Sequence, residues 1–335
     1  MSTRQQLVSE IGEFGLIDRV NTDMIADGLH VVKGIGDDCA VVRTADENSF
    51  QLFTTDMLVE SVHFTTLMKD EDVGYKAIIC SVSDIAAMGG TPQNCLISLG
   101  IPGTLEVDRI ERLYLGMKQA CRQYAINIIG GDTVRSPKEI IINVAMTGIV
   151  NSNKIVYRSG AGVGDLVLVS GSLGLSSIGL RLLQKNIIPT PDSEAFFIKH
   201  CRPQARVELG QKLAEHGATA MNDISDGLAS ELNEIAVSSL AGILIDEQLI
   251  PVAKISLAIQ SLLDKSPTQY ALYGGEDYEL VFTMSRANYT LLDQTTRAAI
   301  TVIGEVTDKF SGVRMQTDAG QIIELKSRGY NHFCD

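Results

Sequence analysis

Hydrophobic positions along the chain recur with two periods in turn, one typical of helices and the other of strands, which predicts alternating elements throughout. Residues 71–88 place Val73, Ala77 and Val82 near helical spacing, and the glycines and proline of residues 89–92 end that helix. Further helices are expected over 5–13, 106–124, 173–183, 204–217 and 227–240. Strands are expected over 38–43, 50–55, 93–101, 127–129, 139–150, 166–170, 243–245, 278–283 and 300–306, and around Ile322.

This order of elements predicts the α/β fold class, with two α/β domains. A chain of 335 residues is too long for one ordinary domain. The glycine-rich crossing over residues 157–165 separates the two series of elements. We therefore expect a first domain over residues 1–150 and a second over 151–335.

The negative net charge of the chain argues against some classes of binding partner. The chain has 28 basic and 41 acidic residues, a net charge of −13. Phosphate backbones and anionic membranes are bound through positive patches, so we expect neither a nucleic acid nor a membrane as partner. ATP stays compatible with this charge, because Mg²⁺ can bridge an acidic protein and an acidic nucleotide.

Cysteine usage and the terminus point to the cytoplasm. The chain has no CxxC pair and no Cys/His spacing of the zinc type, which favours buried free thiols in a reducing compartment. The N-terminus has no apolar signal-peptide core, and no apolar run is as long as a membrane span. The six cysteines are Cys39, Cys80, Cys95, Cys121, Cys201 and Cys334.

Carboxylates stand beside glycine or hydroxyl residues in four short stretches, where we expect a strand or loop to end, and Asp84 adds a fifth position. Carboxylates that converge repel one another unless a positive group lies among them. Hard divalent cations are the simplest such group, and Mg²⁺ commonly serves to hold a polyphosphate. The pattern predicts a metal-dependent enzyme that uses ATP. The four stretches are residues 34–38, 54–56, 130–133 and 222–227.

Each stretch also has a simpler structural interpretation. Residues 54–56 could cap a helix or form a turn, and residues 130–133 could be a tight turn rather than a phosphate-binding loop. Capping by Ser225 or Asp226 would account for one carboxylate of the stretch 222–227 but not for both. Asp84 interrupts an apolar helix, so we expect it to face a polar site.

Four further features have two interpretations each. The acidic stretch 274–279 is either a surface hairpin or the mouth of a site, and Arg158 is either a solvated loop residue or a phosphate contact. His63 and Tyr330 are candidate substrate contacts or ordinary packing residues. The sequence contains no P-loop motif, no HRD or DFG motif and no G-x-S-x-G elbow, which excludes those enzyme classes.

Taken in order, these stretches resemble the thiamine-monophosphate kinase family, and the resemblance spans essentially the whole chain. The matching segments are residues 34–40, 54–56, 72–87, 130–133, 158–161, 223–228, 274–280 and the tail 329–333.

The resemblance implies the fold shared with aminoimidazole ribonucleotide synthetase and selenophosphate synthetase. That fold has two α/β domains and usually forms a homodimer, in which the N-terminal sheets pair and ATP lies near the interface. The first domain would bind ATP and Mg²⁺ and dimerise, and the second would complete the nucleotide and substrate site. The implied reaction converts ATP and thiamine phosphate into ADP and thiamine diphosphate.

The resemblance also implies a role for individual residues, carried over by matching position. Several Mg²⁺ ions would be bound by Asp38, Thr54, Thr55, Asp56, Asp84, Asp132, Asp223 and Asp226. The nucleotide would contact Tyr114, Gly131, Asp132, Arg158 and Ser225. The substrate would contact His63, Glu276 and Tyr330.

The chemistry explains why no convincing catalytic base is found. A phosphate monoester has a second pKa of about 6, so the attacking oxygen is already largely ionised at neutral pH. We expect direct in-line transfer in which the aspartates act as metal ligands, without acid–base catalysis. An aromatic ring at Tyr330 and a carboxylate at Glu276 suit a cationic thiazolium and an aminopyrimidine.

Other members of the fold are the nearest alternatives. A selenophosphate synthetase would carry a reactive cysteine in a glycine-rich N-terminal segment, and residues 1–33 contain no cysteine. A hydrogenase maturation protein would end in cysteine, whereas Asp335 follows Cys334 here. From another class, the chain could be a non-catalytic sensor of Mg²⁺-nucleotide or a scaffold.

Overall fold

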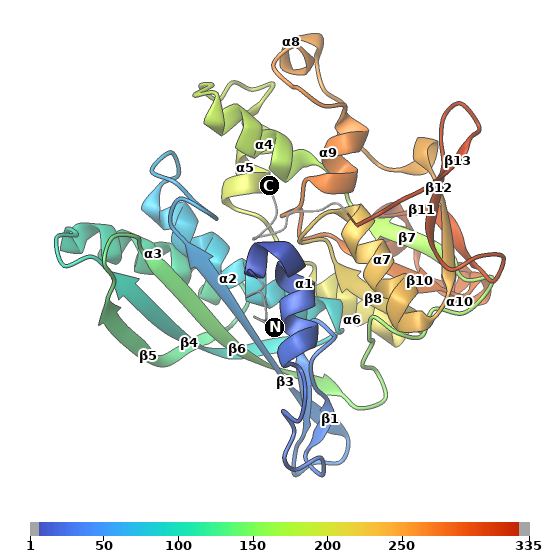
Figure 1. Ribbon diagram of the computed structural model, residues 1–335, viewed down its shortest axis with the longest axis horizontal. Helices are drawn as coiled ribbons and strands as arrows, with labels where there is room; N and C mark the ends of the chain where they lie inside the picture. The colour runs from blue at the N-terminus through green and yellow to red at the C-terminus, as the bar shows by residue number, and fades with distance from the viewer. Residues whose placement is uncertain (1–6, 328–335) are drawn as a thin grey trace, which may run out of the picture.

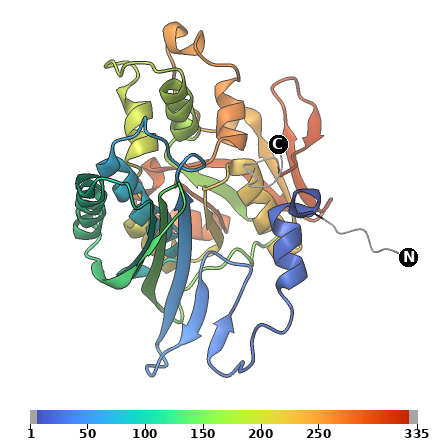
Figure 2. The ribbon, with the colours of Figure 1, turned by 60° about the vertical axis from the view of Figure 1, so that its left-hand side comes forward.

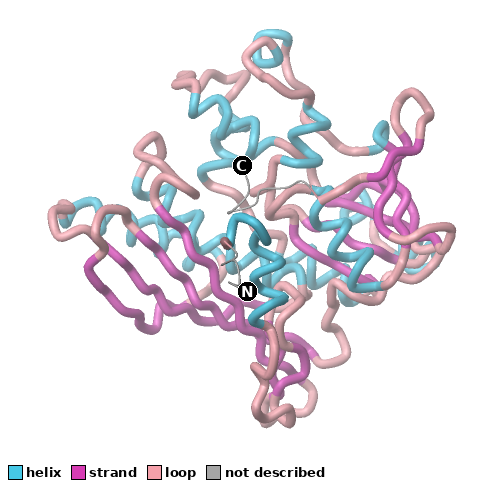
Figure 3. Tube along the Cα trace, viewed as in Figure 1, coloured by secondary structure: helices cyan, strands magenta, loops and turns pink. Residues whose placement is uncertain are grey.

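The structure, a computed structural model, describes residues 7–327 and contains two β-sheets with helices between and around them. The sheet from the first half of the chain and the sheet from the second half lie on opposite sides of a central group of helices (Figure 1). Figure 3 shows the same division, with strands gathered in two separate regions. No helix among the described residues is both long and apolar enough to cross a membrane.

The first sheet has six strands in the order β1-β2-β3-β6-β4-β5. Neighbouring strands are antiparallel except for β4 and β5, which are parallel and are joined by a helical crossover, as parallel pairs require. Helices cover one face of this sheet (Figure 2). The strands are β1 (Val31–Lys33), β2 (Ala40–Arg43), β3 (Ser49–Val59), β4 (Thr91–Ile101), β5 (Asn127–Arg135) and β6 (Ile141–Asn151).

Two glycine contacts explain why the helices α2 (Asp70–Ala87) and α3 (Val107–Gln123) can pack so closely on that face. A Cβ added at Gly74 of α2 would collide with the carbonyl oxygen of Leu113, and one added at Gly116 of α3 would collide with that of Glu71. Almost all of α2 is buried, because the sheet, α3 and the second half of the chain surround it. Helix α2 therefore belongs to the cores of both halves.

The second sheet has seven strands in the order β13-β12-β9-β11-β7-β10-β8, with β12 parallel to β9 and the other pairs antiparallel. Helix α7 packs against its strands over an aliphatic core that includes Leu228, Leu232 and Ile235. The strands are β7 (Leu166–Ser170), β8 (Ala218–Asp223), β9 (Gly242–Asp246), β10 (Leu280–Met284), β11 (Ile300–Thr307), β12 (Gly312–Gln316) and β13 (Ile322–Glu324).

Of the remaining helices, α4, α5, α8 and α9 form the upper group in Figure 1, and α1 lies near its centre. Helix α6 packs against α2 and β8 and so joins the two halves. Their bounds are α1 (Val8–Val20), α4 (Leu175–Gln184), α5 (Glu194–Cys201), α6 (Val207–Glu215), α7 (Leu228–Ser239), α8 (Leu257–Gln260), α9 (Pro267–Tyr273), α10 (Arg286–Leu291) and α11 (Gln294–Ala298), with a 3₁₀ turn over Glu247–Leu249.

Two predicted strand ends are wrong. Residues 54–56 lie in the middle of β3, because the antiparallel ladder with β6 continues without a break from Ser49 to Val59. Residues 130–133 lie inside β5, because its pairing with β4 continues to Arg135. The turn and helix-cap interpretations of both stretches are therefore excluded.

Other predicted bounds also shift. Helix α1 begins at Val8 and ends at Val20, beyond the predicted 5–13. Strand β10 begins at Leu280, after Tyr278, whose φ of 49° is incompatible with a strand. Helices α5 and α9 were not expected at all, because their short apolar patterns provide too few turns to show a period.

Candidate active site

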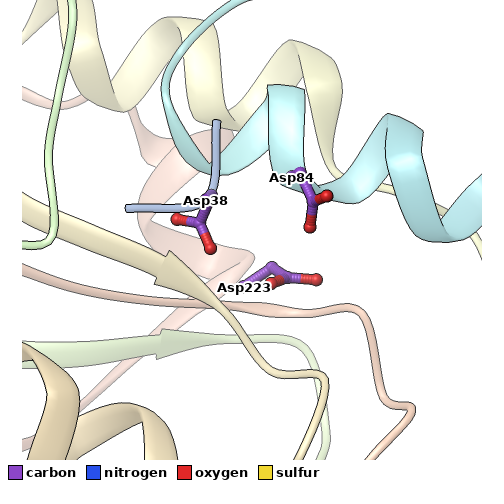
Figure 4. Close-up of side chains that lie close together, drawn as sticks. All are labelled: Asp38, Asp84 and Asp223. Carbon is purple, nitrogen blue, oxygen red and sulfur yellow. The ribbon is translucent and has the colours of Figure 1, made fainter. Parts of the chain in front are cut away.

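Three carboxylates from distant parts of the chain converge between the two sheets. Asp38 precedes β2, Asp84 lies on the last turns of α2, and Asp223 ends β8. One oxygen from each lies within 4.8 Å of the others. Figure 4 shows the three carboxyl groups around one small space, each supplied by a different element.

Hydroxyl groups and one guanidinium hold these carboxylates in place. Thr54 Oγ1 on β3 donates to Asp84, and Ser83 Oγ donates to Asp223 Oδ2 at 2.6 Å. Arg158 Nη2 donates to Asp38 Oδ1 at 2.7 Å. Thr54 lies on β3 and Asp84 on α2, and these two elements pack together. This packing brings the two predicted metal ligands side by side.

The pKa values of all three cluster carboxyls are raised. Burial raises the pKa of the Asp84 carboxyl well above its ordinary value, and the neighbouring carboxylates raise it further. Burial, followed by the charge of Asp38, has the same effect on the pKa of Asp223. Burial also raises the pKa of Asp38 and that of Asp226 to about 7.

The donor set fits Mg²⁺. All ligand atoms are carboxylate oxygens, which hard divalent cations prefer. Among the described residues, Asp38 Oδ2 is a buried oxygen without a hydrogen-bond partner. A buried acceptor without a donor is costly unless a ligand satisfies it.

A cavity of about 530 Å³ lies beside the cluster. Its wall includes Thr55, Asp56, Asp84, Asp223 and Asp226. Three predicted nucleotide and substrate contacts, His63, Ser225 and Glu276, line the same cavity. Its apolar lining is formed by Met57, Leu58, Val62, Phe64, Leu67, Met68, Leu180 and Leu183.

Individual contacts fix the polar lining. Asp56 accepts a hydrogen bond from Ser81 Oγ, and burial raises the pKa of its carboxyl. His63 Nδ1 accepts the backbone N–H of Val59 at 3.0 Å, so the ring proton of a neutral His63 is on Nε2. The backbone N–H of Asp226 donates to the buried Glu231. Neither Ser225 nor Asp226 caps α7, because its N-cap is Gly227 without any side-chain bond.

The acidic stretch 274–279 is buried and is not a surface hairpin. Glu276 lines the cavity, whereas Asp277 accepts backbone N–H groups of Gly174 and Ser176 at the start of α4. Glu279 binds Lys199 and Arg206 at 2.6 Å each. The position of Glu276 is therefore compatible with a place at the mouth of a site. Asp277 and Glu279 instead hold the segment in place through these contacts.

Arg158 lies among acidic groups of both halves. In addition to Asp38, it contacts Glu234 Oε2 through Nη1 at 2.7 Å. It is therefore not a solvated loop arginine, and it neutralises part of the carboxylate cluster in this state.

Three predicted residues neither join the cluster nor line the cavity within this chain. Gly131 and Asp132 lie on the edge strand β5, three strands from β3, which is about 14 Å at ordinary strand spacing. A Cβ at Gly131 would collide with the carbonyl oxygen of Ile97 on β4, which gives this glycine a packing role. Tyr114 lies on α3 and packs against the first core.

Two other predictions lie outside the described residues. The proposed substrate contact Tyr330 and the tail 329–333 fall there, as does Cys334. The five described cysteines are free thiols, four of them buried.

Sequence reasoning missed several polar residues of the site. Lys76, Cys80 and Asp84 lie on one face of α2 at spacings of four, a signal that was available in the sequence. Ser81, Ser83 and Glu234 gave no comparable signal, because Asp56, Asp223 and Arg158, their respective partners, are remote in the sequence.

The chain is similar to known proteins over nearly its whole length. The family model for the AIR synthase related protein N-terminal domain matches residues 36–150, and that for the C-terminal domain matches residues 162–315. Thiamine-monophosphate kinase of Bacillus subtilis (strain 168) is 38% identical over 329 residues, covering 96% of this chain and 99% of the relative. The Aquifex aeolicus (strain VF5) enzyme of the same name is 38% identical over 328 residues, covering 97% and 99%.

Solved structures agree with these matches. The structure described as "AaThiL complexed with AMPPCP and TMP" has a TM-score of 0.86 at 37% identity, covering 98% of this chain and 100% of the other. A hydrogenase maturation protein HypE, at 22% identity and a TM-score of 0.70 over 85% of this chain and 90% of the other, shares the fold. With these likenesses and the converging carboxylates together, the chain belongs to the thiamine-monophosphate kinase family of AIR synthase related proteins.

Proposed function

We propose that this protein transfers the γ-phosphoryl group of ATP to the phosphate of thiamine phosphate, which yields thiamine diphosphate and ADP. The observation that carries the proposal is the buried cluster of Asp38, Asp84 and Asp223 beside a partly apolar cavity. Support comes from relatives named thiamine-monophosphate kinase and from a related structure described as a complex with AMPPCP and TMP.

We propose Mg²⁺ as the cation of this cluster, with several ions per site. Asp38, Asp84 and Asp223 would hold it, with Thr54, Thr55, Asp56 and Asp226 nearby. Bound Mg²⁺ neutralises charge on the transferring phosphoryl group and on both phosphates.

The protein's own residues then position the reactants. Among the described residues, hydroxyl groups and Arg158 are the side chains that hold the carboxylate cluster, and a phosphate acceptor with a second pKa of about 6 needs no catalytic base. Glu276 offers a carboxylate to a cationic or hydrogen-bond-donating part of the vitamin. His63 Nε2 can donate to a substrate acceptor, and Tyr330 is proposed as a stacking contact.

We also propose a homodimer in which the first sheets of two copies face each other. The face of this sheet away from α2 and α3 exposes large apolar side chains, namely Phe53, Leu96 and Val134. An exposed apolar patch of this kind is typical of an interaction surface. In such a dimer, Tyr114, Gly131 and Asp132 would serve a nucleotide near the interface, which accounts for their distance from the cluster of their own chain.

The domain roles follow from the same arrangement. We propose that residues 1–150 bind ATP and Mg²⁺ and dimerise, and that residues 151–335 complete the nucleotide and substrate site. The free thiols and the supply of ATP favour the cytoplasm as the location of the reaction.

Phosphorus NMR with ATP, Mg²⁺ and thiamine phosphate tests the proposal. We expect resonances of ADP and thiamine diphosphate to grow together, and ADP not to form when thiamine phosphate is left out. Binding of ATP without turnover of any phosphorylated vitamin would support a nucleotide sensor instead. The Asp84→Asn variant is the matched control, because it keeps the shape of the side chain and removes its charge.

A further inference from the structure

Lys76 is a fully buried lysine on α2 that neither the metal cluster nor the cavity wall accounts for. Its Nζ lies 2.5 Å from Glu276 Oε1, and the other oxygen, Glu276 Oε2, lies 3.3 Å from His200 Nδ1. His200 is buried too, and its Nδ1 is 3.2 Å from Ser176 Oγ. The carboxylate of Glu276 is thus held on one oxygen by the first half of the chain and on the other by the second.

We propose that Lys76 is a positioning residue that fixes the Glu276 carboxylate in the orientation in which it recognises the vitamin part of the substrate. The inference rests on the proposed function, since it names what this contact does in the same site. The group recognised is a cationic ring or an amine donor of a phosphorylated heterocycle.

The cost of burying charge indicates that the Lys76–Glu276 ion pair does more than stabilise the fold. Removing an ammonium and a carboxylate from water costs several kcal/mol for each ion, and an apolar pair of similar volume is often at least as stable. Lys76 lies on a helix that also buries Val73, Ala77 and Ile79, so a buried apolar side chain is compatible with this helix. The pair is therefore a candidate for a specific functional task.

Backbone conformation supports the same conclusion. Glu276 and Tyr278 both have positive φ values, 57° and 49°, in a region that non-glycine residues seldom adopt. Such conformations persist only where surrounding contacts hold them, and they cluster at functional sites. Here Lys76 holds Glu276 and Cys80 contacts the Tyr278 hydroxyl at 3.0 Å, so one face of α2 anchors both residues.

The charge on Glu276 fits this role. Burial is the largest influence and would raise the pKa of the Glu276 carboxyl, but its charged and hydrogen-bonding neighbours, of which Lys76 is the strongest, together hold the pKa below its ordinary value. Burial, together with the charge of Lys76, lowers the pKa of His200 to about 3. At neutral pH the cavity therefore contains an ionised Glu276 beside a neutral imidazole.

Steady-state kinetics and calorimetry on the full-length protein test the proposal. We expect Lys76→Met to raise KM for thiamine phosphate about ten-fold or more, to leave KM for ATP within about two-fold, and to weaken thiamine phosphate binding measured without ATP. Lys76→Arg should recover part of the loss. Exposed Lys118→Met on α3 is the matched control and should match the wild type.

Combined variants separate positioning from general damage. If Lys76 acts through Glu276, the double variant Lys76→Met with Glu276→Gln should bind thiamine phosphate no more weakly than Glu276→Gln alone. Effects that multiply, or a Lys76→Met variant with unchanged KM, would overturn the proposal.

A last variant keeps the test decisive if Lys76→Met does not fold. Glu276→Asp keeps the charge but withdraws the carboxylate from Lys76, and we expect a similar rise in KM. An unchanged KM in that variant would refute the role of the pair. Failure of the proposed function is distinct, because the wild-type protein would then form no thiamine diphosphate.

Discussion

Replacing Asp84 with asparagine tests whether the clustered carboxylates destabilise the protein when no cation lies among them. The ligand oxygens of Asp38, Asp84 and Asp223 lie within 4.8 Å of one another. Two unit charges at that separation repel by about 3.5 kcal/mol at an effective dielectric constant of about 20. The variant removes two of the three pairs, and its amide keeps the shape of the side chain.

Protonation limits the size of this effect. The ordinary pKa of the group is 3.8, so keeping a proton on Asp84 at pH 8 costs about 6 kcal/mol, at about 1.4 kcal/mol per pH unit. We expect Asp84→Asn to raise the free energy of unfolding of the metal-free protein by about 2–5 kcal/mol at pH 8. For a chain of this length, this corresponds to a Tm increase of about 3–7 °C.

The sign of the pH dependence is fixed by the direction of the pKa shift. Because burial raises the pKa of Asp84 in the folded state, the folded protein holds more protons than the unfolded chain above pH 3.8, and wild-type stability falls as pH rises. The gain from Asp84→Asn should therefore shrink at pH 5, where protonation of the wild-type carboxyl costs only about 2 kcal/mol.

Thermal unfolding followed by circular dichroism in EDTA, at pH 5 and pH 8, measures the effect. The exposed Asp308→Asn serves as control and should change Tm little at either pH. Added Mg²⁺ should then raise the Tm of the wild type and leave that of Asp84→Asn unchanged. A metal-free Asp84→Asn protein less stable than the wild type at pH 8, or a gain equal at both pH values, would refute the reasoning.

Three further predictions test other parts of the structure. The pKa of His200 is about 3 when folded and 6.5 ordinarily, so the unfolded chain binds the extra proton between these values. Stability should fall by about 1.4 kcal/mol per pH unit on acidification through this window, and His200→Gln should lose that part of the slope in urea unfolding. Gly74→Ala should destabilise the protein by about 2–4 kcal/mol because its Cβ meets the Leu113 carbonyl, whereas Gly28→Ala, with no atom within 4 Å, should not. Phe53→Asp on the outer face of β3 should give a monomer in sedimentation experiments if that face forms the dimer, and an unchanged mass would exclude this face.

The sequence was sufficient to identify the clustered carboxylates, but not to predict where the neighbouring strands begin and end. Asp38, Asp84 and Asp223 were identified by their glycine and hydroxyl neighbours and by the break that a charge makes in an apolar helix. Strand ends were inferred for residues 54–56 and 130–133, whereas long ladders with β6 and β4 keep both stretches inside strands. Ladder length depends on the partner strand, which is remote in sequence, so local patterns do not set it.

Lys76 shows a second limit of sequence reasoning. Its spacing from Asp84 was readable on the helix, but its partner Glu276 is 200 residues away, in a segment with two residues at positive φ. Neither the Lys76–Glu276 pair nor the positive φ values of that segment can be predicted from composition or from hydrophobic periodicity. Asp132 shows a third limit, because local sequence patterns do not reveal that it lies on the edge strand β5, away from the cluster.

Helix α2 carries both Asp84, at the proposed phosphate-transfer end of the site, and Lys76, which contacts Glu276 at the proposed ring-recognition end. Eight residues of α-helix separate them, which corresponds to about 12 Å along the axis. Because this segment is rigid and enclosed by both sheets, it acts as a molecular ruler. We therefore expect the enzyme to select substrates by the length of the arm between heterocycle and phosphate, and analogues with a longer arm to be poor acceptors even when both of their ends are unchanged.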